Sequence, residues 1–197
     1  MHVLGVTGSM GSGKSTVSTR LGEHGAMISH SDDLARFLLE NDADILARLR
    51  HRFGDDIIDE SKSLKRALLA KRAFANRENQ QFLNQLIHPK VWQATQKRIE
   101  TARERGYTLF VIDAPLLFEA GVDVYTDSTL VVTADLDVRR KRIWQRSNIS
   151  ADDFDRREAL QMPIEKKIKQ ADYVIENNDS LEELEIRVDD FYLQLKL

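Results

Sequence analysis

A glycine-rich stretch near the amino terminus carries the residues best suited to chemistry. It reads Gly8-Ser9-Met10-Gly11-Ser12-Gly13-Lys14-Ser15 and is followed by Thr16. The spacing of its glycines, lysine and serine is that of a phosphate-binding P-loop. Glycine has no Cβ, so this backbone can turn its N–H groups toward an oxyanion. We therefore predict that this stretch binds the phosphates of a nucleoside triphosphate.

The end of the stretch offers two side chains with distinct roles. Lys14 is expected to reach the β- and γ-phosphates as a point charge, and the Ser15 hydroxyl is expected to bind Mg²⁺. The alternative is a glycine-rich turn that only matches the pattern. The context argues against this alternative, because residues 3–6 predict a buried strand before the loop and residues 14–21 predict a helix after it.

The remaining apolar segments predict an α/β fold around this loop. Short strands are expected at residues 25–28, 108–113, 128–133 and 173–175, with a helix stop at Gly22 before the first of them. Nearly continuous apolar runs are typical of strands buried on both faces of a parallel sheet. Helices are expected from about Leu136, from near Ser150 and from Ser180.

Two of the predicted strands lead into carboxylates, where ligands bind in α/β sheets. Asp32 and Asp33 open a helix shortly after the strand at 25–28, and Asp113 ends the strand at 108–113. Asp32 is a candidate for orienting an acceptor hydroxyl or for holding Mg²⁺, directly or through water. Helix capping is the alternative role for each of these carboxylates.

The segment from residue 44 to residue 105 is predicted to be mostly helical. Apolar residues recur at helical spacing around Leu49, Leu68 and Leu86, and His88-Pro89 is expected to start a further helix. The segment is too long for a simple crossover between strands. We interpret it as a helical insertion that would carry the second substrate of a transferase.

Basic side chains gather after the strand at 128–133. Arg139, Arg142 and Arg146 lie on one stripe of a predicted helix, at three- and four-residue steps. They are candidates for phosphate contact, and the alternative is a solvated face that pairs with nearby acids. The polar segment 147–169 is a candidate lid that excludes water from phosphoryl transfer, or else an inert pair of surface helices.

The composition is that of an ordinary globular chain. A length of 197 residues allows one good-sized core with small inserted subdomains. A net charge of −3 supplies no global basic field, so we expect neither nucleic acid nor a membrane as partner. The chain has no cysteine and no apolar run of membrane-spanning length. We expect no signal peptide, because the first residues predict a strand that leads into the P-loop. We expect a cytoplasmic protein without an obligate protein partner.

Over nearly its whole length the chain resembles the dephospho-CoA kinase family. The most specific shared motifs are Leu86-Ile87-His88-Pro89 and Pro115-Leu116-Leu117-Phe118-Glu119. The resemblance implies a P-loop NTPase three-layer α/β/α fold with a central parallel sheet, a helical substrate-binding insertion and a small lid. The implied parts are a core at 1–40, 106–146 and 170–197, a helical CoA-substrate subdomain at 41–105 and a lid at 147–169.

The resemblance also implies the reaction. Members transfer the γ-phosphoryl of ATP to the ribose 3′-hydroxyl of dephospho-CoA with the help of Mg²⁺, which is the last step of coenzyme A synthesis. Asp32 matches the aspartate that serves the acceptor hydroxyl, and it would hold Mg²⁺ together with Ser15. Lys14 and Arg142 would be the other catalytic residues.

The remaining implied site residues bind the two substrates. Those expected to contact ATP are Gly11, Ser12, Gly13, Lys14, Ser15, Thr16, Arg142, Arg146 and Asn177. Those expected to contact the acceptor are Asp32, Arg66 and His88.

One position departs from the pattern of the family. Members usually carry an aspartate two positions before the one that Asp32 matches, and this chain has His30 there. The sequence identifies no partner that would fix the tautomer of His30, so we interpret it as a tolerated polar neighbour rather than a new base. Asp113 is a candidate for binding Mg²⁺ through water, but it is not universal among relatives, which weakens the case for an essential metal role.

Two other activities are compatible with a P-loop. One is a kinase of the same fold that acts on another metabolite or a nucleotide, because such kinases differ mainly in the acceptor pocket. The other is a nucleotide switch that binds partners. The chain has no Asn-Lys-x-Asp motif for guanine, and its row of arginines is more natural for phosphoryl transfer.

Overall fold

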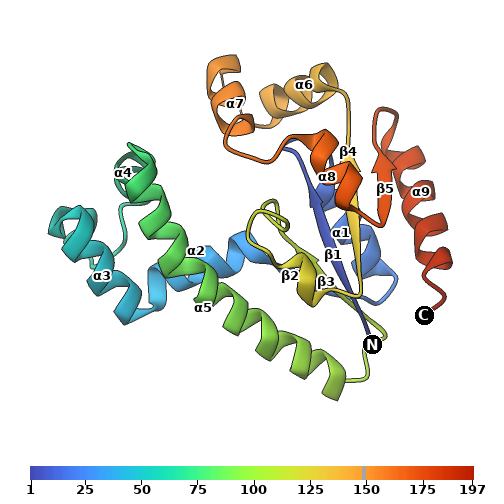
Figure 1. Ribbon diagram of the computed structural model, residues 1–197, viewed down its shortest axis with the longest axis horizontal. Coiled ribbons are helices and arrows are strands. Elements are labelled where there is room, and N and C mark those ends of the chain that lie inside the picture. The colour runs from blue at the N-terminus through green and yellow to red at the C-terminus, as the bar shows by residue number, and fades with distance from the viewer. Residues whose placement is uncertain (148–149) are drawn as a thin grey trace. The chain divides into compact units, whose positions relative to one another are not determined.

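The computed structural model describes residues 1–147 and 150–197. Within them, five strands form one sheet in the order β2-β3-β1-β4-β5, and every neighbouring pair is parallel (Figure 1). The strands are β1 (His2–Gly8), β2 (Met27–His30), β3 (Leu109–Asp113), β4 (Ser128–Thr133) and β5 (Tyr173–Glu176). The predicted α/β fold with a central parallel sheet is confirmed.

The described chain divides into two compact units. The sheet unit comprises residues 1–30 and 98–197, and the helical unit comprises residues 31–97. The helical unit thus begins thirteen residues before the start of the segment that the sequence pattern marked as helical, and α5 (Arg77–Glu104) begins in it and ends in the sheet unit.

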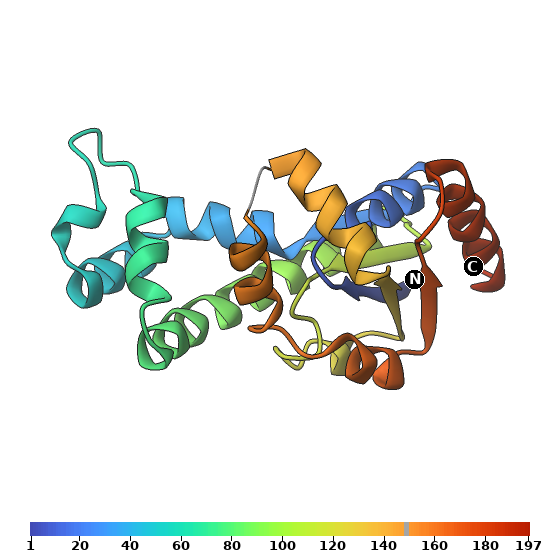
Figure 2. The same cartoon turned by 90° about the horizontal axis from the view of Figure 1, so that it is seen from above.

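Helices cover both faces of the sheet in the sheet unit. Figure 2 shows α1 (Lys14–Glu23) and α9 (Leu181–Gln194) along one face and α8 (Ile164–Gln170) on the other. Strand side chains alternate between the two faces, so every second residue of each strand meets α1 and α9. The apolar core formed there includes Leu4, Val6, Val17, Leu21, Leu109, Val111, Leu130, Val132, Leu184 and Val188.

The shorter elements of the sheet unit follow β3 and β4. A 3₁₀ turn spans Asp123–Tyr125, and α6 (Leu136–Ser147) and α7 (Ala151–Glu158) come after β4. The Ser150 hydroxyl caps α7 by accepting the N–H of Asp153, and the Ser180 hydroxyl caps α9 in the same way. The helices predicted from these serines therefore begin one residue after them.

The helical unit has its own apolar core. It contains α2 (Ser31–Asn41), α3 (Ala43–Phe53), α4 (Arg66–Ala73), the first part of α5, and a 3₁₀ turn at Asp55–Ile57. The buried members of this core are Ile45, Leu49, Phe53, Ile57, Leu69, Ala73, Leu86 and Ile87. Because its core is separate from that of the sheet, this unit can present its own set of polar side chains.

The expected helix stop at Gly22 is wrong. Helix α1 continues to Glu23, and Gly25 ends it with a left-handed φ of +91°. The N–H groups of Gly25 and Ala26 then bond to the carbonyls of Gly22 and Leu21, which satisfies the open end of the helix. Strand β2 consequently starts at Met27, two residues later than predicted, and includes Ser29 and His30.

The expectation that His88-Pro89 starts a helix is also wrong. Helix α5 runs without interruption from Arg77 to Glu104 and contains Pro89 in its interior. Proline removes one intrahelical hydrogen bond and normally ends or kinks a helix. Here Leu86 and Ile87, directly before His88-Pro89, are buried in the core of the helical unit, so tertiary packing overrides the local preference.

Candidate functional site

The P-loop connects the end of β1 to α1 in the sheet unit. Gly11 and Gly13 have left-handed φ angles of +81° and +95°, which only glycine adopts at low cost. Gly13 is the N-cap of α1, and no side chain caps that helix. The free N–H groups of the first turn and the positive end of the helix dipole therefore face an incoming anion.

A buried carboxylate stands beside the loop. Asp113 is the last residue of β3 and is 3% exposed. One of its oxygens accepts a hydrogen bond from Nζ of Lys14, which makes an ion pair. The other oxygen lies 2.8 Å from Nδ1 of His30. Lys14, Asp113 and His30 thus form one cluster, and Asp113 is its centre.

The sheet register explains why these residues meet. His30 and Asp113 are directly paired in the parallel ladder between β2 and β3, and both are the last residues of their strands. β3 also pairs with β1, which leads into the P-loop. All three parts of the cluster therefore come from the carboxyl edge of the sheet, where ligands bind in this class of fold.

The first arginine of the predicted stripe is a structural residue. Arg139 is 4% exposed; its Nε donates to the carbonyl of Ala134, and one of its terminal nitrogens lies 2.8 Å from the carboxylate of Glu158 in α7. The carbonyl of Arg139 would also lie 2.8 Å from a Cβ on Gly11. Arg139 thus connects α7 and the P-loop to α6 by direct contacts. Its guanidinium group is therefore not available to bind a phosphate.

The second arginine is linked to the P-loop through Asn177. Arg142 donates to the backbone carbonyl of Asn177 over 2.8 Å and to its side-chain oxygen over 3.2 Å. The amide nitrogen of Asn177 donates to the carbonyl of Ser12 over 2.8 Å. Asn177 is 5% exposed and touches Gly13 so closely that a Cβ there would lie 2.2 Å from its amide nitrogen. Both predicted ATP-binding residues therefore support the loop in this structure.

The remaining predicted residues of the sheet unit are more accessible. Arg146 is exposed near the end of α6 and has no hydrogen bond or ion pair to any described residue. Ser15 is exposed and its hydroxyl has no partner in the described chain, whereas Thr16 is half-buried. The Ser12 side chain is fully buried, so its contribution to a ligand must come from the backbone.

Mg²⁺ prefers oxygen ligands and usually keeps several waters beside substrate phosphates. The accessible Ser15 hydroxyl at the start of α1 fits this preference, and Asp113 supplies a carboxylate in the same unit. Among the described residues no group of three or more histidines and carboxylates forms a complete cage. The donor set therefore suits a metal that arrives with phosphates.

The other three predicted residues belong to the helical unit. Asp32 is exposed in the first turn of α2, and Arg66 starts α4 with its Nε 3.0 Å from the carboxylate of Glu40. His88 is half-buried in α5, and its burial lowers its pKa, so the imidazole is neutral at pH 7. A neutral imidazole with no partner in the described chain can donate or accept a hydrogen bond.

The segment predicted as a lid contains α7 and α8, and its residues 148–149 lie outside the described part of the chain. Phe154 of α7 is buried, with the guanidinium groups of Arg139 and Arg140 5.7 and 5.9 Å from its ring centre. Lys167 of α8 is fully buried and bonds to the carbonyl of Pro115 and to Glu119. The segment is thus attached at both ends by specific polar contacts.

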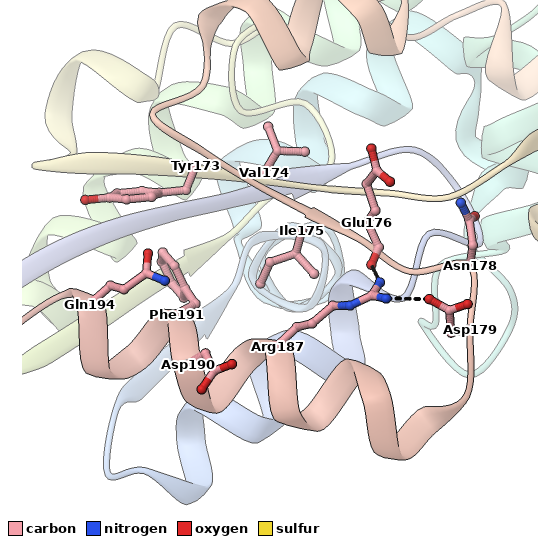
Figure 3. A pocket seen from close by; sticks show the side chains of 10 residues that line it. All are labelled: Tyr173, Val174, Ile175, Glu176, Asn178, Asp179, Arg187, Asp190, Phe191 and Gln194. Atoms are coloured by element: carbon pink, nitrogen blue, oxygen red, sulfur yellow. Dashed lines mark hydrogen bonds and ion pairs between the residues drawn. The ribbon is translucent and has the colours of Figure 1, made fainter.

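A hollow of about 460 Å³ lies beside β5 and α9 (Figure 3). Arg187 points across it and donates to the carbonyl of Glu176 and to the carboxylate of Asp179. None of its lining residues belongs to the P-loop or to the Lys14 cluster. We therefore locate the candidate site by the P-loop and not by this hollow.

Local sequence patterns did not indicate the cluster of Lys14, Asp113 and His30 or the burial of Arg139 and Lys167. A signal for the cluster existed, because parallel strands that end together bring their last side chains together. The predicted strand stopped at Ile28, so His30 was placed beyond the sheet. Partners from distant segments, such as Glu158 and Glu119, leave no comparable local pattern.

Comparison with known proteins gives a consistent result. Residues 2–183 match the family model described as dephospho-CoA kinase. A dephospho-CoA kinase of Syntrophotalea carbinolica is 39% identical over 183 residues, which cover 93% of this chain and 87% of that protein. Among solved structures, TT1252 from Thermus thermophilus is similar with a TM-score of 0.84 at 34% identity, covering 98% of this chain and 97% of that one. Dephospho-CoA kinase from Campylobacter jejuni follows with 0.74 at 25%, covering 98% and 96%.

Proposed function

This chain belongs to the dephospho-CoA kinase family, and we propose on that premise which of its residues carry out the reaction. The enzyme transfers the γ-phosphoryl of ATP to the ribose 3′-hydroxyl of dephospho-CoA, which gives CoA and ADP in the last step of CoA biosynthesis. Such a transfer requires little covalent chemistry from the protein, so positioning and charge neutralisation account for most of the catalysis.

The P-loop binds the phosphates of ATP. The observation that carries this assignment is the uncapped start of α1 behind a loop whose glycines have positive φ, with Lys14 as the first helical residue. Lys14 neutralises charge on the β- and γ-phosphates as the leaving group departs. The loop residues assigned to ATP are Gly11, Ser12, Gly13, Lys14, Ser15 and Thr16.

Three further residues complete the ATP site. Arg142, as a catalytic residue, lies one hydrogen bond from Asn177, which in turn holds the carbonyl of Ser12. An arginine in that position stabilises charge on the transferred group when it turns toward the phosphates. Arg146 is exposed on the same helix and can reach a ligand without breaking a contact. Asn177 holds the P-loop and Arg142 in a fixed relative position through its hydrogen bonds with Ser12 and Arg142.

Mg²⁺ would be held by the Ser15 hydroxyl, by Asp32 through water and by the phosphates of ATP. When bound, it neutralises charge on the β- and γ-phosphates. Ser15 is supported by its accessible hydroxyl at the start of α1, and Asp32 by its exposed place in the first turn of α2. Metal-dependent quenching of a fluorescent ATP analogue in wild type and Ser15→Ala tests this set without turnover.

The acceptor is bound by Asp32, Arg66 and His88. Asp32 orients the 3′-hydroxyl or accepts its proton late in the transfer. Arg66 carries a charge suited to the anionic groups of dephospho-CoA, and the neutral imidazole of His88 offers a hydrogen bond. We place this reaction in the cytoplasm, without nucleic acid or an obligate protein partner, in keeping with the cysteine-free sequence and its net charge of −3.

The experiment that tests the function measures ADP release from ATP and Mg²⁺ with dephospho-CoA, next to a panel of nucleoside monophosphates and shikimate. The expected result is ADP formation that depends on dephospho-CoA, together with a product heavier by one phosphate. If ADP formed only with another acceptor, the chain would still be a kinase of this fold, but dephospho-CoA would not be its substrate.

The assigned role of Asp32 has its own test. Asp32→Asn should lower kcat by about 10²–10⁴-fold, because it removes the group that serves the acceptor hydroxyl. ATP affinity should stay close to that of the wild type. Asp33→Asn, next to it in the same exposed turn, is the matched control. Turnover of Asp32→Asn equal to that of the control would exclude Asp32 from the mechanism.

A further inference from the structure

His30 is held in one orientation by a buried partner. Its Nδ1 lies 2.8 Å from an oxygen of Asp113, whose carboxylate is 3% exposed. The second oxygen of Asp113 accepts from Lys14, so both oxygens are engaged by nitrogen donors. The ring of His30 is therefore fixed on one edge by a group that belongs to the phosphate site.

The partner also decides the tautomer. A carboxylate oxygen accepts hydrogen bonds, so Nδ1 of His30 must carry the hydrogen that it donates. In the neutral imidazole this leaves Nε2 with a lone pair. Nε2 has no hydrogen-bond partner among the residues that the structure describes, and the His30 side chain is 43% exposed. A hydrogen-bond acceptor of defined direction is thus presented to solvent.

The position of this acceptor is informative. His30 ends β2, at the carboxyl edge of the sheet, and shares the carboxylate of Asp113 with the P-loop lysine. The group that binds the transferred phosphoryl and the imidazole are therefore adjacent. A hydroxyl placed for attack on that phosphoryl must lie in the same small region, so hydroxyl groups of the phosphoryl acceptor come within reach of the imidazole.

We propose that Nε2 of His30 accepts a hydrogen bond from a hydroxyl of the phosphoryl acceptor, and that Asp113 fixes the imidazole for this task. The inference rests on the proposed function and adds an acceptor-binding residue to it. Asp113 then has two roles: one of its oxygens pairs with Lys14 of the ATP site, and the other orients His30, which binds the acceptor. The competing role for His30 is structural, namely to hold Asp113 in place.

Two substitutions separate these roles. In His30→Asn the amide nitrogen takes approximately the place of Nδ1, so the contact to Asp113 survives and the Nε2 acceptor is lost. In His30→Gln the amide reaches approximately the place of Nε2, so an acceptor survives and the contact to Asp113 is lost. A substrate contact and a structural contact therefore predict opposite rankings of the two variants.

The experiment measures kcat and KM for dephospho-CoA and for ATP in wild type, His30→Asn and His30→Gln. We expect His30→Asn to lose about tenfold in kcat/KM for the acceptor, the effect of one hydrogen bond, with KM for ATP unchanged. His30→Gln should stay above His30→Asn. A kcat/KM of His30→Asn equal to or above that of His30→Gln overturns the proposal.

Failure of the proposed function gives a different result, because the wild type itself would then show no ADP formation dependent on dephospho-CoA. A measurement on the wild type covers the case in which His30→Asn does not fold. Nitrogen-15 spectra of the histidine rings should show His30 with hydrogen on Nδ1, and its Nε2 resonance should move when dephospho-CoA is added. Hydrogen on Nε2, or a resonance that stays in place, overturns the proposal.

Discussion

The P-loop and helix α6 both carry basic side chains, but they hold them in different ways. Lys14 is held by a single carboxylate, that of Asp113, and keeps part of its surface exposed. Arg139 is buried and bonds to Ala134, Met10 and Glu158. A cation can serve a ligand only if the contacts that it gives up are few and are replaced by the ligand.

The three arginines of α6 extend this comparison along one helix. They share one stripe, yet Arg139 is buried, Arg142 bonds to Asn177, and Arg146 is exposed without a partner in the described chain. Spacing placed them on a common face, and the elements packed on that face determined what each of them contacts. Availability to phosphate therefore rises from the start of the helix to its end.

The largest expected effect is at Lys14. Lys14→Ala should lower kcat/KM for ATP by about 10²–10³-fold or more, because a preorganised cation at the developing charge is removed. Lys141→Ala, an exposed lysine on α6, is the control and should retain full activity. Steady-state kinetics check both variants, and unchanged kinetics in Lys14→Ala would contradict the P-loop assignment.

Arg139 and Arg146 should give opposite results in stability and in binding. Arg139→Met should cost about 3 kcal/mol of unfolding free energy, because it leaves Glu158 and two backbone carbonyls without their donor. Arg146→Met should change stability by less than about 0.5 kcal/mol and should raise KM for ATP. Urea unfolding and kinetics on both variants test this. A stable Arg139→Met would show that α7 does not depend on this contact.

Gly13 and Gly25 have nearly equal φ angles, but only Gly13 lies in the P-loop. Comparing alanine variants of the two therefore distinguishes the cost of backbone strain from an effect on ATP binding. Gly25→Ala should lose about 1–2 kcal/mol of stability because its φ is left-handed, and Gly13→Ala, with nearly the same φ, should lose at least as much. Only Gly13→Ala places a methyl group 2.2 Å from the amide of Asn177, whereas Gly25 has open space. We expect the affinity for ATP, measured by calorimetry, to fall at least about tenfold in Gly13→Ala alone. Equal affinities would mean that Asn177 does not position the loop.

The smallest effect is expected at a charge cluster that joins α1, the helix of Lys14, to α9. The Asp189 carboxylate of α9 accepts from Arg20 and from His24 over 2.7 Å, and these bonds hold its pKa far below the usual range. The folded pKa lies below the unfolded one, so this contribution is complete above the unfolded pKa of about 4 and declines as the pH falls below it.

Asp189→Asn should therefore have a flatter decline of Tm than the wild type between about pH 5 and about pH 2, while turnover near neutral pH is unchanged. Thermal unfolding followed by circular dichroism checks this. A decline as steep as that of the wild type would mean that other carboxylates dominate the acid response. The contacts of Arg20 with Asp189 would then contribute little to the dependence of stability on pH.

The sequence by itself predicted the parallel sheet, all five of its strands within two residues at each end, and the P-loop with its lysine and serine. It could do so because these features depend on local order: apolar runs form strands, and glycine spacing determines the backbone of the loop. The same local signals were misread at Gly22, where the helix continues and Gly25 ends it, and at Pro89, where the packing of Leu86 and Ile87 keeps the helix continuous.

Only the tertiary structure decided which polar side chains meet. His30 acquires its partner because β2 lies beside β3 in the sheet, and Arg139 acquires Glu158 because α7 packs on α6. These partners are 83 and 19 residues apart along the chain. A hydrogen bond requires two atoms within about 3 Å, and over such separations that distance is fixed by packing and register and not by spacing in the sequence.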